Sequence, residues 1–202
     1  TIAGHAAPFG TDLIFAARDM PDLTIAVEIC EDVWVPNPPS SAAALAGAAV
    51  IANLSASNVT VGKSDYRHAL CRVQSARCFA AYLYSAAGHG ESTTDLAWDG
   101  HAMIYENGAL LAESARFADQ PQLIAAAVDL AVLRQERTRP SSRGDNRGDQ
   151  AFRRIPFTLH ALAGAIRLVP PTDRVLCDPN VDSNHDDLGF ETLKHPLAGL
   201  LL

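Results

Sequence analysis

Cys30 is the residue of this sequence best placed to do covalent chemistry. It follows the apolar, β-type run Thr24–Ile29 and comes directly before the polar residues Glu31 and Asp32. The backbone must turn sharply at this point. The thiol would therefore be held at the edge of a sheet with little rotational freedom, as a cysteine nucleophile requires. The competing interpretation is a buried cysteine that packs as a small hydrophobic residue.

The segments that must position Cys30 are predicted to alternate between strands and helices. The predicted strands are Thr24–Ile29, Val50–Leu54 and Phe79–Tyr84, and the predicted helices are Ala42–Gly47, capped by Ser40 or Ser41, and Asp65–Ala76. This order favours crossover units and a layered α/β fold. The first strand has apolar residues on both faces, which is typical of a sheet covered on both sides.

The pattern changes in the second half of the chain. A hairpin is predicted over residues 100–113, with Asn107-Gly108 at its apex, because this dipeptide favours tight hairpin turns. A strand over Leu123–Val128 and a helix over Leu130–Arg137, capped by Asp129, are predicted next. Pro140–Gln150 is interpreted as an exposed loop. Phe152–Phe157 could pack back on the domain.

Composition excludes several classes of protein. The chain has 202 residues, of which 48% are apolar and 19% charged, so it is globular rather than disordered. A net charge of −7 without a basic cluster argues against a nucleic-acid surface. No apolar run is long enough to cross a membrane. The four cysteines form no C-x-x-C pair and no zinc-like spacing with the seven histidines, which indicates no metal site and a reducing, cytoplasmic location.

Several motifs together resemble the glutaminase domain of the glutamine-dependent NAD synthetases, a nitrilase-type branch of the carbon-nitrogen hydrolases. They are Val27–Trp34 around the cysteine, Pro8–Phe15, Asn53–Ser57 with Gly62-Lys63, Gln74–Cys78 and Glu91–Gly100, the last of which general nitrilases lack. The resemblance implies an α-β-β-α sandwich. It further implies that residues 1–157 are the C-terminal part of this domain, incomplete at the N-terminus. Residues 158–202 would then be a linker toward a missing synthetase domain.

The resemblance implies that Cys30 attacks the side-chain amide of glutamine. The family uses a Glu-Lys-Cys set in which both partners precede the cysteine. The 29 residues before Cys30 contain Glu28 but no lysine, so the partners are expected upstream of Thr1. Glu28 does not occupy the family's base position and is left unassigned.

Four residues are predicted from the resemblance to contact the substrate. Ser57 would hydrogen-bond the glutamine, although a serine is also common in turns. Lys63 would anchor its carboxylate at a position where relatives can carry arginine, without the bidentate geometry of arginine. The backbone N–H of Glu31 can point into an oxyanion site, while its side chain and that of Asp32 could equally cap the turn. Trp34 would line the pocket, although a buried tryptophan needs no functional explanation.

In the whole enzyme, the resemblance implies that the ammonia travels to a synthetase domain that uses ATP and Mg²⁺ to amidate deamido-NAD. The expected partners are glutamine, that missing domain and further copies of the chain in a homo-oligomer; this chain itself would hold no cofactor. Two alternatives stay open, a stand-alone nitrilase-type amidase and a catalytically incomplete remnant that serves in assembly. A Cys-His hydrolase using His89 is a third, weaker hypothesis.

Overall fold

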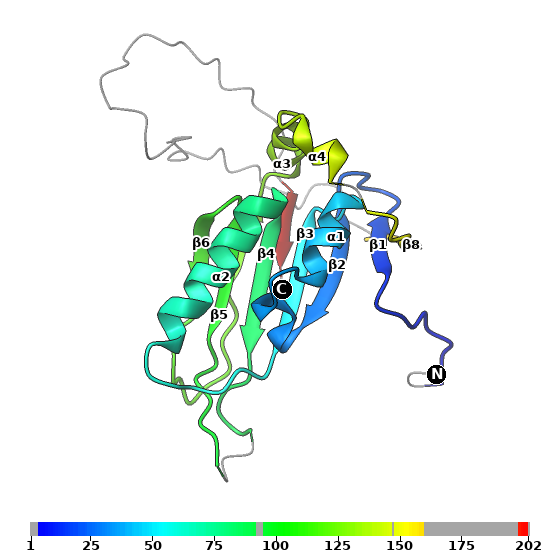
Figure 1. The fold of residues 1–202 in the computed structure, drawn as a ribbon. Helices are drawn as coiled ribbons and strands as arrows, with labels where there is room; N and C mark the ends of the chain where they lie inside the picture. Colours follow the sequence, from blue (N-terminus) through cyan, green and yellow to red (C-terminus); the bar gives the residue numbers. More distant parts are fainter. Residues whose placement is uncertain (1–3, 92–94, 147, 160–197, 202) are drawn as a thin grey trace, which may run out of the picture.

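The computed structural model describes residues 4–91, 95–146, 148–159 and 198–201. Its centre is a seven-stranded sheet with the strand order β6-β5-β4-β3-β2-β1-β8 (Figure 1). In chain order the elements are β1 (Leu13–Ala17), β2 (Thr24–Ile29), the 3₁₀ helix η1 (Cys30–Trp34), α1 (Pro39–Leu45), β3 (Val50–Ser55), α2 (Lys63–Cys78), β4 (Ala81–Ala86), β5 (Ala102–Glu106), β6 (Ala109–Glu113), β7 (Ala125–Val128), α3 (Leu130–Glu136), α4 (Ser142–Asp145), β8 (Arg153–Phe157) and β9 (Ala198–Leu201). The predicted mixed α/β fold is confirmed.

The middle of the sheet is parallel. β2, β3 and β4 pair in parallel, and α1 and α2 provide the two crossover connections. Both helices lie on the same face of the sheet (Figure 1). Because parallel strands end at the same edge, the residues that follow β2 and β3 are brought together there. This edge carries Cys30 and the loop of residues 56–62.

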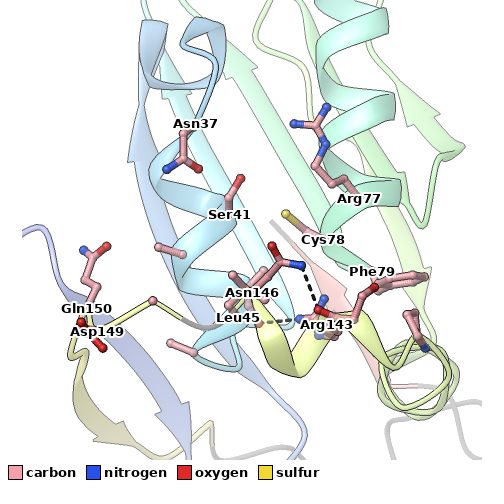
Figure 2. Close-up of a pocket in the computed structure, with 16 residues that line it drawn as sticks. Asn37, Ser41, Leu45, Arg77, Cys78, Phe79, Arg143, Asn146, Asp149 and Gln150 are labelled. Carbon is pink, nitrogen blue, oxygen red and sulfur yellow. Dashed lines mark hydrogen bonds between the residues drawn. The ribbon is translucent and has the colours of Figure 1, made fainter.

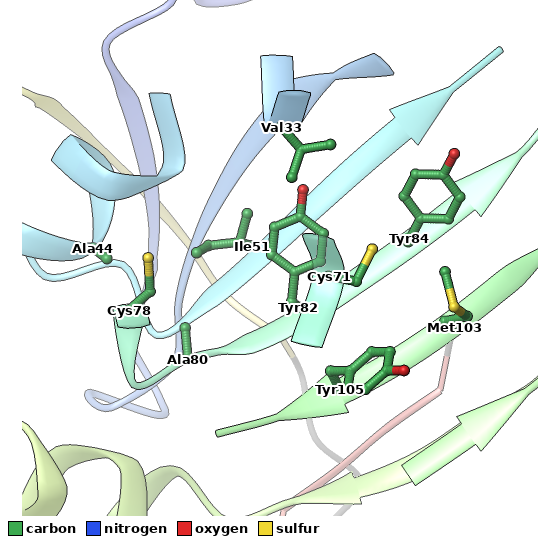
Figure 3. Close-up of a cluster of buried hydrophobic side chains, with 10 residues drawn as sticks. All are labelled: Val33, Ala44, Ile51, Cys71, Cys78, Ala80, Tyr82, Tyr84, Met103 and Tyr105. Carbon is green, nitrogen blue, oxygen red and sulfur yellow. The ribbon is translucent and has the colours of Figure 1, made fainter. Parts of the chain in front are cut away.

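The face beneath α1 and α2 is a closed core. Tyr82 and Tyr84 point into it from β4, while Ala81 and Leu83 point to the other face, as the period of two in a strand dictates. Cys71 and Cys78, two turns apart on α2, reach the same core; its remaining buried members are Val33, Ala44, Ile51, Ala80, Met103 and Tyr105 (Figure 3). Both cysteines are buried.

The opposite face of the sheet is covered unevenly. α3 and β7 pack over the residues near β3 and β4, with Leu133 and Val128 buried. Toward the carboxyl ends of β2 and β3, however, Val27, Ile29 and Leu54 remain 45%, 63% and 60% exposed. Coverage of both faces was predicted from the apolar pattern of β2. The described part of the chain provides it on one face and only partly on the other.

Several predicted elements differ from the structure. α1 begins at Pro39 without a side-chain cap, because a proline at the first position already has the helical φ, and Ser40 lies inside the helix. β4 begins at Ala81, because Phe79 ends α2 with a φ of +49°. The predicted loop over 140–150 contains the short helix α4.

Other sequence predictions agree with the structure. The β5–β6 hairpin turns at Asn107-Gly108, and both residues have a positive φ. The carboxylate of Asp129 accepts a hydrogen bond from the N–H of Val132 and caps α3. Residues 153–157 return to the sheet as β8, parallel to β1.

The end of the chain is described only in part. The predicted linker over 158–202 lies mostly outside the described residues, apart from positions 158–159 and β9, which pairs antiparallel with β7. Among the helices in the described ranges, none combines the length and the apolar character that crossing a bilayer requires.

Candidate active site

Cys30 occupies a strained turn at the end of β2. Its φ of +53° lies in the left-handed region, which residues with a Cβ atom seldom adopt. The carboxylate of Asp32 accepts a 2.8 Å hydrogen bond from the N–H of Ile29 and closes the turn, so Asp32 has the capping role considered for it. The Cys30 side chain is half-buried. Such strain is concentrated at functional sites, where the surrounding structure holds it in place.

A buried chain of hydrogen bonds fixes the backbone of this turn. The Nδ2 atom of Asn53 donates to the carbonyl oxygen of Cys30 and to the hydroxyl of Tyr82, at 3.2 Å each. The Tyr82 hydroxyl donates to one carboxylate oxygen of Glu28, and the N–H of Ser40 donates to the other at 2.9 Å. Burial, reinforced by the charge of Glu28, raises the pKa of Tyr82, which therefore stays a hydrogen-bond donor. With both oxygens engaged inside the fold, Glu28 has a structural position.

Lys63 lies beside the aromatic residues that follow Cys30. It is the first residue of α2, and its Nζ atom donates to the side-chain oxygen of Asn58 at 2.9 Å. The same Nζ atom lies 5.3 Å from the centre of the Trp34 ring, and Trp34 packs against Tyr66 with ring centroids 5.0 Å apart. An ammonium group has three donors, so a single bond to Asn58 leaves capacity for a ligand.

The electrostatics of Lys63 connect it to Cys30. Partial burial is the largest influence and lowers the pKa of Lys63, and the positive charge of Arg67 lowers it further. The charges of Cys30 and Asp99 act in the opposite direction. Lys63 therefore lies within electrostatic range of Cys30.

Ser57 is buried, and Arg67 holds it in place. The Nε atom of Arg67 donates to the Ser57 hydroxyl at 3.2 Å, and one of its terminal nitrogens donates to the Ser57 carbonyl at 2.7 Å. The other terminal nitrogen of Arg67 forms a bidentate ion pair with Asp99, at 2.7 and 2.9 Å, and both side chains are buried. Arg116 donates to the same carboxylate at 2.9 Å.

Sequence reasoning missed Arg67. A signal for it does exist, because Arg67 lies four residues before Cys71 and eleven before Cys78 on one helix face. A charged residue on a buried face needs a buried partner of opposite charge. That partner is Asp99, which lies in the motif Glu91–Gly100.

The remaining predicted residues are more exposed. Glu31 is exposed on η1, directly after Cys30. His89 is largely exposed, and its Nδ1 atom lies 3.9 Å from the carboxylate of Asp119, an acidic group on the surface. These contacts give no support to a Cys30-His89 pair.

The fold brings together two histidines that the sequence places far apart. The rings of His68 and His101 are 5.1 Å apart, and both reach the carboxylate of Glu113. The prediction of no metal site rested on spacing along the sequence, which does not measure distance in the fold.

A pocket of about 870 Å³ lies elsewhere, between α1, the end of α2 and α4 (Figure 2). Its polar lining includes Ser41, Arg77 and Arg143. None of the predicted catalytic or substrate-binding residues lines it.

The comparison with known families identifies the class of protein to which this fold belongs. The sequence profile of the carbon-nitrogen hydrolases, described as "Carbon-nitrogen hydrolase", matches residues 4–138. The chain therefore belongs to the carbon-nitrogen hydrolase family.

Within this family the chain is similar to particular synthetases. It is 54% identical over 178 residues to the glutamine-dependent NAD(+) synthetase of Mycobacterium tuberculosis, a match that covers 86% of this chain and 26% of that protein. It is also 54% identical to the Mycobacterium leprae synthetase, over 83% of this chain and 25% of that protein. The chain thus spans about a quarter of the length of these curated relatives. The resemblance inferred from the sequence is confirmed.

A solved structure supports the fold. The nitrilase-superfamily protein Nit3 of Saccharomyces cerevisiae, at 22% identity, superposes with a TM-score of 0.51 over 61% of this chain and 44% of that one.

Proposed function

We propose that Cys30 is the nucleophile of a glutaminase. Its thiolate attacks the side-chain amide carbon of glutamine, the C–N bond breaks, and ammonia leaves with a proton. Water then hydrolyses the thioester, which releases glutamate and regenerates the thiol. The observation that carries this proposal is the left-handed turn at Cys30, held by Asn53 at the carboxyl edge of a parallel sheet.

We assign the neighbouring residues to the substrate. Lys63 anchors the carboxylate of glutamine, and the ring of Trp34 lines the pocket beside it. Ser57 belongs to the loop that contacts the glutamine, in a position fixed by Arg67. The backbone N–H of Glu31 contributes to the oxyanion site, where a fixed donor stabilises the developing negative charge.

The partners of Cys30 come from outside the 202 residues in this proposal. They are a carboxylate that moves the proton and a lysine that stabilises the oxyanion. In the longer protein, the ammonia passes to a synthetase domain that amidates deamido-NAD with ATP and Mg²⁺. A cytoplasmic location and a homo-oligomeric state are part of the same proposal.

The test uses the complete enzyme and an electrophile that mimics glutamine. We expect the label on Cys30, and we expect Cys30→Ala to abolish glutamine-dependent synthesis while ammonia-dependent synthesis survives. Cys78→Ala, which changes a core cysteine, is the matched control and should still be labelled. Labelling of Cys71 or Cys78 in place of Cys30 would refute the assignment.

A further inference from the structure

Three metal-ligating side chains meet on the side of the molecule where α2 packs on β5 and β6. His68 comes from α2, Glu113 from the end of β6, and His101 from the residue before β5. The Nε2 atoms of His101 and His68 lie 2.8 and 3.1 Å from the same Glu113 oxygen, and one ligand atom from each residue lies within 4.8 Å of the others. We propose that these three residues form a binding site for a divalent transition metal of the Zn²⁺ type.

The spacing of the ligand atoms fits such an ion. Zn²⁺ binds imidazole nitrogen and carboxylate oxygen at about 2.0–2.2 Å in a tetrahedral arrangement, which sets neighbouring ligand atoms about 3.3 Å apart. The two separations from Glu113 are already near this value. Small side-chain rotations therefore suffice to admit the ion, and three protein ligands leave a fourth position for water.

The surroundings of the second ring nitrogen, Nδ1, in each histidine are also compatible with a bound metal. The Nδ1 atom of His68 lies 2.6 Å from the Tyr105 hydroxyl, an arrangement that fixes the ring while leaving Nε2 for the ion. The Nδ1 atom of His101 has no hydrogen-bond partner among the described residues. Its ring can therefore carry the proton on Nδ1 when Nε2 binds the metal.

The ion could enter the site from solvent, and it would cross-link two elements of the fold. The His101 side chain is fully buried, whereas those of His68 and Glu113 are 28% and 35% exposed, so the cluster opens to solvent on one side. His68 follows Arg67, and His101 lies two residues after Asp99. A bound metal would cross-link α2 to the hairpin directly beside the buried Arg67–Asp99 pair.

The test uses the complete natural protein in a Cys30→Ala background, so that the half-buried Cys30 thiol cannot bind the ion. Co²⁺, added as a spectroscopic probe and then displaced by Zn²⁺, should give the d–d absorption of tetrahedral nitrogen and oxygen ligands without thiolate charge-transfer bands. Isothermal titration with Zn²⁺ gives the affinity. Neither measurement depends on glutamine hydrolysis.

The variants His68→Gln and Glu113→Gln should each abolish the Co²⁺ spectrum. Tyr105→Phe removes only an outer partner and should weaken Zn²⁺ binding about 10–100-fold. His89→Gln, which changes an exposed histidine, is the matched control and should leave both signals unchanged. If the Co²⁺ spectrum is absent from the parent protein, or persists equally in His68→Gln, the cluster is a hydrogen-bond network only and the proposal is wrong. Absence of the spectrum from the parent refutes the proposal even where a variant fails to fold.

Discussion

The buried face of α2 and its first turn lie in different environments. In the buried interior, Arg67 and Gln74 have their polar groups bonded to other residues of this chain, and Cys71 and Cys78 pack in the core. At the first turn, Lys63 is half-buried, with its hydrogen bond to Asn58 and its contact with the Trp34 ring.

The difference teaches which residues are available for chemistry. A buried polar group must find its partners within the fold, because leaving it unsatisfied is costly. Such a group is already occupied and contributes to stability. At the Cys30 edge, by contrast, Lys63 has hydrogen-bond donors that are not used within the fold, and the backbone of Cys30 is strained. Both features are typical of a ligand-binding site.

The largest expected effect concerns the glutaminase activity of the Cys30 edge in the 202-residue chain alone. We expect the 202-residue chain alone to release no ammonia from glutamine, because proton transfer by a positioned acid or base is worth about 10²–10⁴-fold in rate. It should also associate, since Val27, Ile29 and Leu54 expose apolar surface on one sheet face. Ammonia-release assays and sedimentation velocity measure the two properties.

The opposite result would change the assignment of partners. Robust turnover by a monodisperse monomer would mean that the catalytic partners of Cys30 lie inside this chain. Glu28 and His89 would then be the first residues to mutate.

The fold could be predicted from the sequence where local rules decide. Alternating strands and helices, the Asn107-Gly108 turn and the Asp129 cap all depend on residues close in the chain. The position of Cys30 followed in the same way from an apolar strand that ends in acidic residues.

Long-range pairs could not be predicted in this way. Arg67 meets Asp99 across 32 positions of sequence, and His68 meets Glu113 across 45. Residue type alone does not say which distant residue will be the partner. The uneven cover of the second sheet face was missed for a related reason, since an apolar strand shows that cover is needed but not what provides it.

A second prediction compares the reactivity of Cys30, at the end of β2, with that of the core cysteines Cys71 and Cys78. Burial, together with the charge of Glu28, raises the pKa of Cys71 to about 12 and that of Cys78 to about 11. At pH 8 only about one in 10³–10⁴ of these thiols is ionised, against roughly a quarter of an ordinary thiol. We expect iodoacetamide to label Cys30 at least about 10²-fold faster than either buried cysteine, as measured by peptide mass spectrometry.

That contrast has its own control. Unfolding in guanidinium should remove the difference, because all the thiols then ionise alike. Equal labelling rates in the native protein would mean that the core beneath α2 is open to solvent.

A third prediction concerns the stability of the interior. Arg67→Met leaves Asp99 as a buried charge without its bidentate partner and should destabilise the protein by about 3–5 kcal/mol. Arg72→Met, at an exposed position of the same helix, should change stability by less than about 0.5 kcal/mol. Chemical denaturation of the complete protein compares the two. Similar values for both variants would contradict a structural role for Arg67.

The smallest expected effect concerns Lys63 and is the most specific to substrate. Lys63→Ala should raise KM for glutamine about 10-fold, equivalent to about 1.4 kcal/mol, with little change in kcat. The reason is that a carboxylate anchor binds ground state and transition state alike.

The control variant is Lys63→Arg, which keeps the charge and should restore most of the affinity. The stability of both variants should match that of the parent, because Lys63 is half-buried at the helix end. Steady-state kinetics with glutamine and with ammonia separates the cases: KM for ammonia should not move. An unchanged KM for glutamine in Lys63→Ala would mean that Lys63 only pairs with Asn58, and the first turn of α2 would then belong with the structural interior.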